Sequence, residues 1–208
     1  MNEHVYIERI IRSRLPGNCL LILSNGDNVI SPLDALMMLG LNKGSNFTEN
    51  HKEDIQKIAN SIKIKSYSMK LAAGYARSEF QIRQKLKQKE YSKDLIDQTI
   101  IWLTKMNLID DKRFSENFVR YGIQKKWGIN KVKRELDKRG VDLLTYKDIL
   151  DDFFENTDQL KTALEVTAKK MHLMRNKPKD KQKDALFRHL ILKGFDYDII
   201  KKVIYEIF

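Results

Sequence analysis

Three segments of the sequence align without gaps: IRQKLKQKEY at residues 82–91, VKRELDKRGV at 132–141 and LFRHLILKGF at 186–195. Each places two apolar residues four positions apart, on one face of a helix. A basic residue follows three positions later, and the second and third segments then continue with glycine and an apolar residue. This ending is typical of a helix C-terminus, because a cation favours the negative end of the helix dipole and glycine readily adopts the left-handed conformation. Glu90 replaces glycine in the first segment, so we expect that turn to be looser or differently closed.

Further helical patterns flank each of these segments. Candidate N-caps precede runs of apolar residues three or four apart, at Ser92, Asp110 or Asp111, Thr157 or Asp158, and Asp196. A period near 50 residues with three helices per period indicates a tandem helical array. We therefore expect a mainly α fold, with three three-helix repeats at residues 67–112, 113–157 and 158–208 in an elongated, curved arrangement.

Residues 1–62 have a different pattern, typical of a small β-hairpin and helix domain. Short β-favouring runs at residues 5–11 and 19–23 are separated by Pro16-Gly17, and Val29-Ile30 would form a returning strand. Asn25-Gly26 between the last two runs predicts a two-residue hairpin turn, because both positions tolerate positive φ.

Two helices are expected in the same region. Ser31 as cap and Pro32 at the first helical position predict a short helix that stops at Gly40. A second helix is expected near residues 54–62.

Composition and charge limit the class of protein. The chain carries 39 Lys and Arg against 28 Asp and Glu, a net charge of +11, which predisposes it to bind polyanions. The single cysteine, Cys19, has no partner for an internal disulfide and lies in an apolar run typical of a buried thiol. No stretch approaches the roughly 18 apolar residues of a membrane span. We expect a cytoplasmic protein with no membrane partner, and a monomer.

Catalytic and metal-binding patterns were sought next. The four histidines occur singly, without the one-turn spacing of a helical zinc site. The paired acids Asp110-Asp111 and Asp151-Asp152 adjoin helix ends, where capping explains them. No Gly-rich phosphate loop and no nucleophile elbow occurs. We therefore expect a protein that works by binding, with no enzyme activity, no cofactor and no metal.

Clusters of lysine and arginine are the candidate binding residues. Lys131, Arg134 and Lys138 lie on one face of a predicted helix, three and then four positions apart. Arg83 and Lys87, four apart, occupy the matching positions of the first unit. Residues 175–183 hold five cations around a proline and read as a basic loop between two helices. The candidate partner-binding or DNA-binding residues are therefore Arg83, Lys87, Lys125, Lys126, Lys131, Arg134, Lys138, Lys177, Lys179 and Lys181.

A solvated helix face explains any one of these clusters, but their recurrence in two units favours binding. The two tryptophans add one open question. Trp102 lies beside an apolar stripe and is expected in the core. For Trp127, in a polar loop before a helix, core packing at a unit junction and contact with a partner both stay open.

Several stretches of the chain resemble the RecX family, bacterial proteins that modulate the RecA recombinase. They are ARSEF at residues 76–80, LIDDKRF at 108–114, WGI at 127–129, LDKRGV at 136–141, LKGF at 192–195 and DII at 198–200. The N-terminal strands and helix are similar to the extra domain of longer family members. Glu90 departs from the usual glycine, and Phe80 stands where the family usually has leucine.

This resemblance implies a specific function. Family members consist of three repeats of a three-helix unit, bind in the groove of the RecA filament on single-stranded DNA, block its extension and favour its disassembly. They thereby damp recombination, DNA repair and the SOS response, and they are not enzymes. The implied partners are the RecA filament and single-stranded DNA, contacted directly or through RecA. The alternative is a helical module that binds nucleic acid directly and has no RecA partner.

Overall fold

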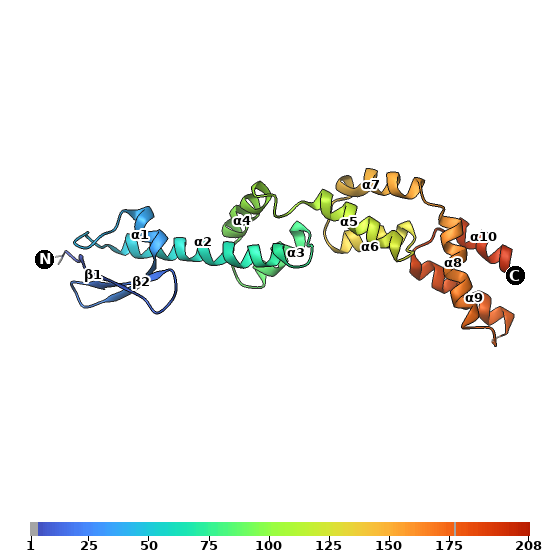
Figure 1. The fold of residues 1–208 in the computed structure, drawn as a ribbon, viewed down its shortest axis with the longest axis horizontal. Coiled ribbons are helices and arrows are strands. Elements are labelled where there is room, and N and C mark those ends of the chain that lie inside the picture. Colours follow the sequence, from blue (N-terminus) through green and yellow to red (C-terminus); the bar gives the residue numbers. More distant parts are fainter. Residues whose placement is uncertain (1–3, 177) are drawn as a thin grey trace.

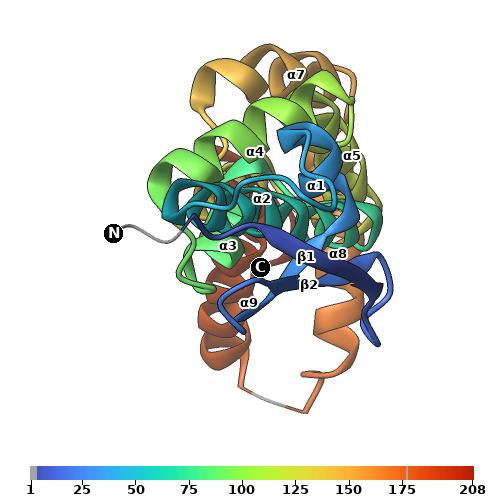
Figure 2. The same cartoon turned by 90° about the vertical axis from the view of Figure 1, so that its left-hand side faces the viewer.

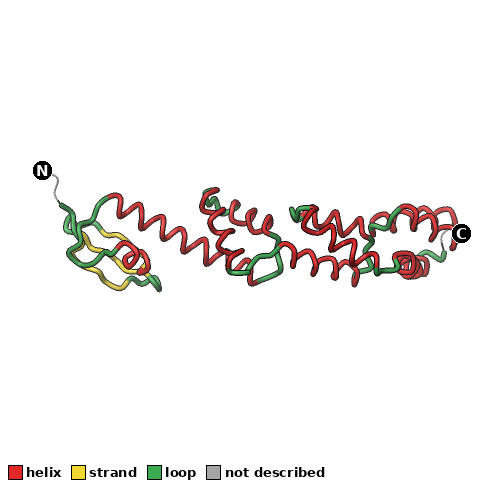
Figure 3. Tube along the Cα trace, turned by 90° about the horizontal axis from the view of Figure 1, so that it is seen from above, coloured by secondary structure: helices red, strands yellow, loops and turns green. Residues whose placement is uncertain are grey.

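The computed structural model describes residues 4–176 and 178–208 of the chain. The molecule is elongated, and its parts follow one another along the long axis in sequence order (Figure 1). Strands are confined to the N-terminal end, and the regular elements described elsewhere are helices (Figure 3). The predicted mainly α fold with a small N-terminal β-hairpin and helix domain is confirmed. The predicted curvature is slight in both views along the long axis.

The N-terminal domain is a three-stranded antiparallel sheet followed by a helix. Its elements are β1 (Ile7–Arg12), β2 (Asn18–Leu23), β3 (Asn28–Pro32) and α1 (Leu33–Leu39), with the strands in the order β1-β2-β3. Alternate residues of β2 are buried, so one sheet face covers the core, where Ile7, Leu21 and Ala35 are fully buried.

Two predicted details of this domain are wrong. The β2–β3 loop is longer than two residues, because the Leu23 N–H donates to the Asp27 carbonyl (2.9 Å) and Gly26 alone between them has a positive φ, 86°. Ser31 does not cap α1, since it still pairs within β3, its hydroxyl donates to the Pro32 carbonyl, and Pro32 is the N-cap residue. Gly40 ends α1 in the left-handed conformation, as predicted.

Helix α2 (Glu49–Ala73) is a single helix of 25 residues that connects the sheet domain to the array. Thr48 and His51 form a capping box at its start, so the helix begins earlier than predicted. Buried Ile55 and Ile64 anchor its two ends to different cores, which lets it pass without a break through residues 62–67. The expected domain boundary therefore falls within a helix, and our division of the chain into units stays a proposal.

The remaining helices form three successive groups, each with its own core. They are α3 (Glu79–Lys87), α4 (Lys93–Lys105), α5 (Asp111–Gln124), α6 (Ile129–Lys138), α7 (Leu143–Glu155), α8 (Gln159–His172), α9 (Lys179–Lys193) and α10 (Tyr197–Ile207). The end of α2 with α3 and α4 forms unit 1, α5–α7 form unit 2, and α8–α10 form unit 3. The aligned apolar pairs are completely buried at the centres of the three cores: Ile82 and Leu86, Val132 and Leu136, Leu186 and Leu190.

Helix starts follow the capping signals of the sequence. Ser92, Asp110 and Asp158 cap α4, α5 and α8, and their side chains accept backbone N–H groups from the first turn. Of the two alternatives at each site, Asp110 rather than Asp111 and Asp158 rather than Thr157 is therefore the cap. The start of α9 was wrongly predicted, because Lys179 already belongs to the helix and the basic loop before it is shorter than expected.

The middle helices α3, α6 and α9 all end in a left-handed residue. Gly140 has φ 68° and Gly194 has φ 85°, as predicted from their position. Glu90 has φ 59°, so the first unit closes with the same backbone conformation, and the expectation of a different closure is wrong. Within the described residues, no helix is long and apolar enough to cross a membrane.

Candidate functional site: the joints between units and their basic surface

The middle helices of the three units lie head to tail along the array (Figure 1). The C-terminal end of α6 meets the N-terminal end of α3, and a Cβ at Gly140 would lie 2.2 Å from the Phe80 ring. The C-terminal end of α9 meets the start of α6 in the same way, where a Cβ at Gly194 would lie 2.2 Å from the Lys131 nitrogen. Each glycine thus serves both the left-handed turn and close docking on the preceding unit. The positive end of one helix dipole also faces the negative end of the next, which favours the arrangement.

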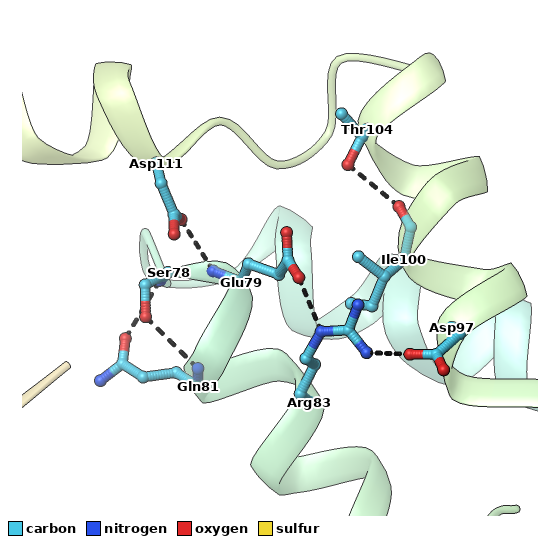
Figure 4. A network of polar contacts seen from close by, with 8 residues as sticks. All are labelled: Ser78, Glu79, Gln81, Arg83, Asp97, Ile100, Thr104 and Asp111. Carbon is cyan, nitrogen blue, oxygen red and sulfur yellow. Dashed lines mark hydrogen bonds and ion pairs between the residues drawn. The ribbon is translucent and has the colours of Figure 1, made fainter. Parts of the chain in front are cut away.

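The joint between units 1 and 2 uses side chains. Ser78, the N-cap of α3, donates its hydroxyl hydrogen to the Arg139 carbonyl just before Gly140. Asp111, in the first turn of α5, accepts the Glu79 N–H at 2.8 Å (Figure 4). Burial, followed by the negative charges of Glu79 and Asp110, raises the pKa of the Asp111 carboxyl against the lowering effect of that hydrogen bond.

Arg83 belongs to the same network and serves unit 1 internally. Its guanidinium bonds Glu79 one turn earlier at 2.6 Å and also Asp97 of α4 (Figure 4). Both partners are carboxylates of the same unit, so Arg83 ties α3 to α4. This occupied guanidinium is a weaker candidate for partner binding than the sequence suggested.

The joint between units 2 and 3 brings backbone against backbone. The Gly128 N–H donates to the Lys193 carbonyl (2.8 Å), and the Asn130 N–H donates to the Gly194 carbonyl (3.1 Å). A Cβ at Gly128 would lie 2.2 Å from the Gly194 oxygen, so this approach requires glycine on both sides. Lys126 forms an ion pair with Glu165 of α8, which also spans the joint.

A basic hollow of about 420 Å³ opens beside this second joint. Its cationic lining comes from three elements, the end of α5, α8 and α9: Lys125, Lys126, Lys169, Lys170, His189 and Lys193. Gln124, Val166 and Leu173 complete the wall, so no carboxylate lines the hollow among the residues that the structure describes. We call this feature the joint hollow.

The cations of the joint hollow destabilise one another's charge. Burial, followed by the charge of Lys131, lowers the pKa of Lys193. Burial, followed by the charges of Lys170, Lys193 and Lys131, lowers the pKa of His189. A bound anion would relieve both effects, so the hollow is electrostatically prepared for negative charge.

Aromatic rings lie next to these cations. Trp127 is half-buried against the unit 2 core and packs on Phe118 and Tyr121. The Lys131 ammonium lies 4.4 Å from the Trp127 ring centroid, and that of Lys125 lies 5.5 Å from the Tyr121 ring. Trp127 therefore packs at the unit junction, and its partner contact stays a prediction. Trp102 packs against the core of unit 1, as predicted.

The other predicted site residues are dispersed. Arg134 and Lys138 are exposed on α6, while Lys131 packs under Gly194. Lys179 and Lys181 are exposed on the first turn of α9, and Lys177 lies outside the described residues.

The proposed match between units is also wrong. Superposing Ile82 on Val132 pairs Arg83 with Lys133 and exposed Lys87 with Asp137. The positions that correspond to Lys131, Arg134 and Lys138 are Gln81, Gln84 and Gln88. The basic face of α6 is thus specific to unit 2.

Four residues of the joint hollow were missed by sequence reasoning: Lys169, Lys170, His189 and Lys193. Lys169 and Lys170 are adjacent cations in the last turn of α8, a pattern equally typical of a helix C-terminus. Their proximity to Lys125 and Lys193 follows from the joint, which no local pattern shows. In the described part of the chain, no group of three or more His, Cys, Asp or Glu could hold a metal ion.

Comparison with known proteins identifies the array. Models of the first, second and third three-helix domains of RecX match residues 65–103, 110–143 and 157–204, which together make up more than half of the chain. The chain belongs to the RecX family. It is 30% identical over 170 residues to regulatory protein RecX of Clostridium perfringens, covering 79% of this chain and 78% of the relative. It is 32% identical over 164 residues to regulatory protein RecX of Clostridium botulinum, with 75% of each chain covered.

A solved structure shows the same fold. The crystal structure of a regulatory protein RecX superposes with a TM-score of 0.75, covering 96% of this chain and 98% of the other at 22% identity. The sheet domain and all three units are therefore within the shared fold. As a member of the RecX family, the chain is a regulatory protein.

Proposed function

We propose that this protein binds the RecA filament on single-stranded DNA, inhibits its extension and activity, and so modulates recombination, DNA repair and the SOS response. Membership of the RecX family supports this partner. The observation that carries the proposal is the basic surface of unit 2 and its joint with unit 3, on an elongated body that can follow a filament. The protein acts in this role by binding, as a cytoplasmic monomer that needs no metal or cofactor.

Acid and base are separated on the array, which supports a single binding side. Helix α7 carries Asp148, Asp151, Asp152 and Glu155 against one cation, Lys147. It lies at the opposite edge of the array from α9 (Figures 1 and 2). A filament that presents phosphate would be attracted by the α6 and α9 side and repelled by α7.

The test is RecA-dependent ATP hydrolysis on single-stranded DNA, with this protein well below the number of DNA sites. We expect the wild type to lower the rate and the double variant Arg134→Glu/Lys138→Glu to lose most of this effect at moderate salt. Both side chains are exposed, so helicity should be unchanged. The matched control is Lys43→Glu/Lys63→Glu, the same charge change at exposed positions far from α6.

The alternative function, direct nucleic-acid binding without RecA, predicts a different outcome. Such a module would act only by covering DNA, at amounts comparable with the DNA sites, and equally on filaments of unrelated proteins. A wild-type protein that leaves RecA turnover unchanged until the DNA is saturated would refute the proposed function.

A further inference from the structure

We propose that the joint hollow binds the phosphodiester backbone of a single nucleic-acid strand, which then bridges units 2 and 3. The inference deepens the proposed function and rests on it for the biological setting, but it concerns contact of this chain with the strand itself. It can therefore be tested without RecA.

The first support is the origin of the cations. Lys125 and Lys126 belong to unit 2, whereas Lys169, Lys170 and Lys193 belong to unit 3. Glu165 lies at the rim and is paired with Lys126, which leaves the other four lysines without a printed carboxylate partner inside the hollow. Five ammonium groups around one open hollow are more than a structural ion pair needs, and they match the spacing of successive phosphates along a flexible strand.

The second support is the apolar and aromatic surface between these cations. Val166 and Leu173 form part of the wall, and Leu173 is 77% exposed. Tyr121, beside Lys125, is 44% exposed. Surfaces that bind single strands combine cations for the backbone with flat apolar groups for sugars and bases. Inorganic phosphate would use the lysines alone, so the wall favours a strand.

The third support is His189. Lys170 of α8, Lys131 of α6 and Lys193 of its own helix face it, with Lys125, Lys126 and Lys169 around the same hollow. The lowered pKa of His189 means that the free protein disfavours the imidazolium form. A bound phosphate adds negative charge and raises that pKa again, so binding takes up a proton. Affinity should then fall as the pH rises through the titration range of His189.

The experiment measures fluorescence anisotropy of a labelled oligothymidylate with the full chain at several salt concentrations. The double variant Lys169→Gln/Lys170→Gln should bind about tenfold more weakly near 0.15 M salt, and the slope of log affinity against log salt should decrease by about 0.7 per lost contact. The matched control is Lys179→Gln/Lys181→Gln, which removes the same charge from the same unit. Its side chains lie roughly 20 Å along α9 from the hollow, beyond the screening length of about 8 Å, so its affinity should stay near wild type.

Two further arms separate the possible results. His189→Gln should remove the pH dependence of the wild type, while retaining most of its affinity at the alkaline end. Tripolyphosphate should compete poorly with the strand. Equal losses for the two lysine pairs would show a diffuse charge effect and overturn the proposal. A hollow variant that loses tripolyphosphate binding but keeps strand binding would also overturn it, in favour of a site for a free polyphosphate. Failure of either kind would leave inhibition of RecA to be judged by its own assay.

Discussion

The joint between units 1 and 2 and the joint between units 2 and 3 seat the same helix end on the same helix start by different contacts. At the first joint Ser78 and Asp111 supply the polar contacts through side chains, and Phe80 covers Gly140. At the second joint the backbone of Gly128 and Asn130 bonds the backbone at the end of α9. One glycine is needed for the first approach and two for the second.

This difference predicts how each joint tolerates change. A side-chain contact can shift by rotamer, and the Phe80 ring is 42% exposed, so it has room to move. Backbone contacts leave no such freedom, because the Lys131 nitrogen cannot move without unwinding the start of α6. The second joint should therefore be the more rigid of the two, and it is the one beside the joint hollow.

The largest effect is expected from valine at the two docking glycines. Gly194→Val combines a left-handed backbone with a backbone obstacle at 2.2 Å, and should lower the free energy of unfolding by about 3 kcal/mol or more. Gly140→Val meets only the Phe80 ring and should cost less, about 1–2 kcal/mol. Urea unfolding followed by far-UV circular dichroism measures both.

Gly44→Val is the control for the backbone conformation alone. Gly44 has φ 87°, and nothing lies within 4 Å of a Cβ built there. If all three valine variants lose the same stability, the docking contacts contribute nothing and the contrast between the joints is wrong.

A medium effect is expected at Asp111 in the first joint. Asp111→Ala leaves the Glu79 N–H without its acceptor and should cost about 1 kcal/mol. Asp111→Asn keeps an oxygen for that N–H and removes a charge that burial disfavours, so at neutral pH it should be as stable as wild type or slightly more stable.

The pH dependence gives this comparison its sign. Because the pKa of Asp111 is raised in the folded state, its contribution is most favourable below the pKa of the unfolded chain and is lost as the pH rises through the folded value. The stability of Asp111→Asn relative to wild type should therefore increase with pH across the acid range and then level off. Urea titrations at a series of pH values test this, and a difference that decreases with pH would contradict it.

The smallest effect is expected where a middle helix ends without a joint. Glu90 is exposed and left-handed, and no preceding three-helix unit docks on it. Glu90→Gly should be neutral or stabilising by up to about 1 kcal/mol in thermal or urea unfolding. The reciprocal change Gly140→Glu should be clearly destabilising, and equal magnitudes for the two swaps would mean that docking does not select the glycine.

Much of the fold follows from local patterns. The apolar pairs at Ile82 and Leu86 and their two repeats predict the cores, and capping residues predict most helix starts. Local reasoning failed where a contact from elsewhere decides the outcome. The length of α2 depends on its two ends reaching different cores, and the left-handed Glu90 is tolerated because nothing docks there.

The candidate site was less predictable than the fold. Charge spacing along one helix indicated α6, where Arg134 and Lys138 are indeed exposed. The same reasoning also selected Arg83, which is held by two carboxylates of its own unit. The joint hollow depends on how closely Gly128 approaches the end of α9, and this distance sets which lysines meet.

The two ends of the array determine that it stops at three units. Head-to-tail docking of one unit on the next is a heterologous contact, which between separate chains would propagate into a fibre instead of closing. Helix α9 starts seven residues before Leu186, whereas α3 and α6 start three residues before Ile82 and Val132, so an extra turn stands where a fourth unit would dock. Glu90 places a charged side chain where the opposite end would need glycine. Copies of this chain therefore cannot polymerise through the contact that builds each of them.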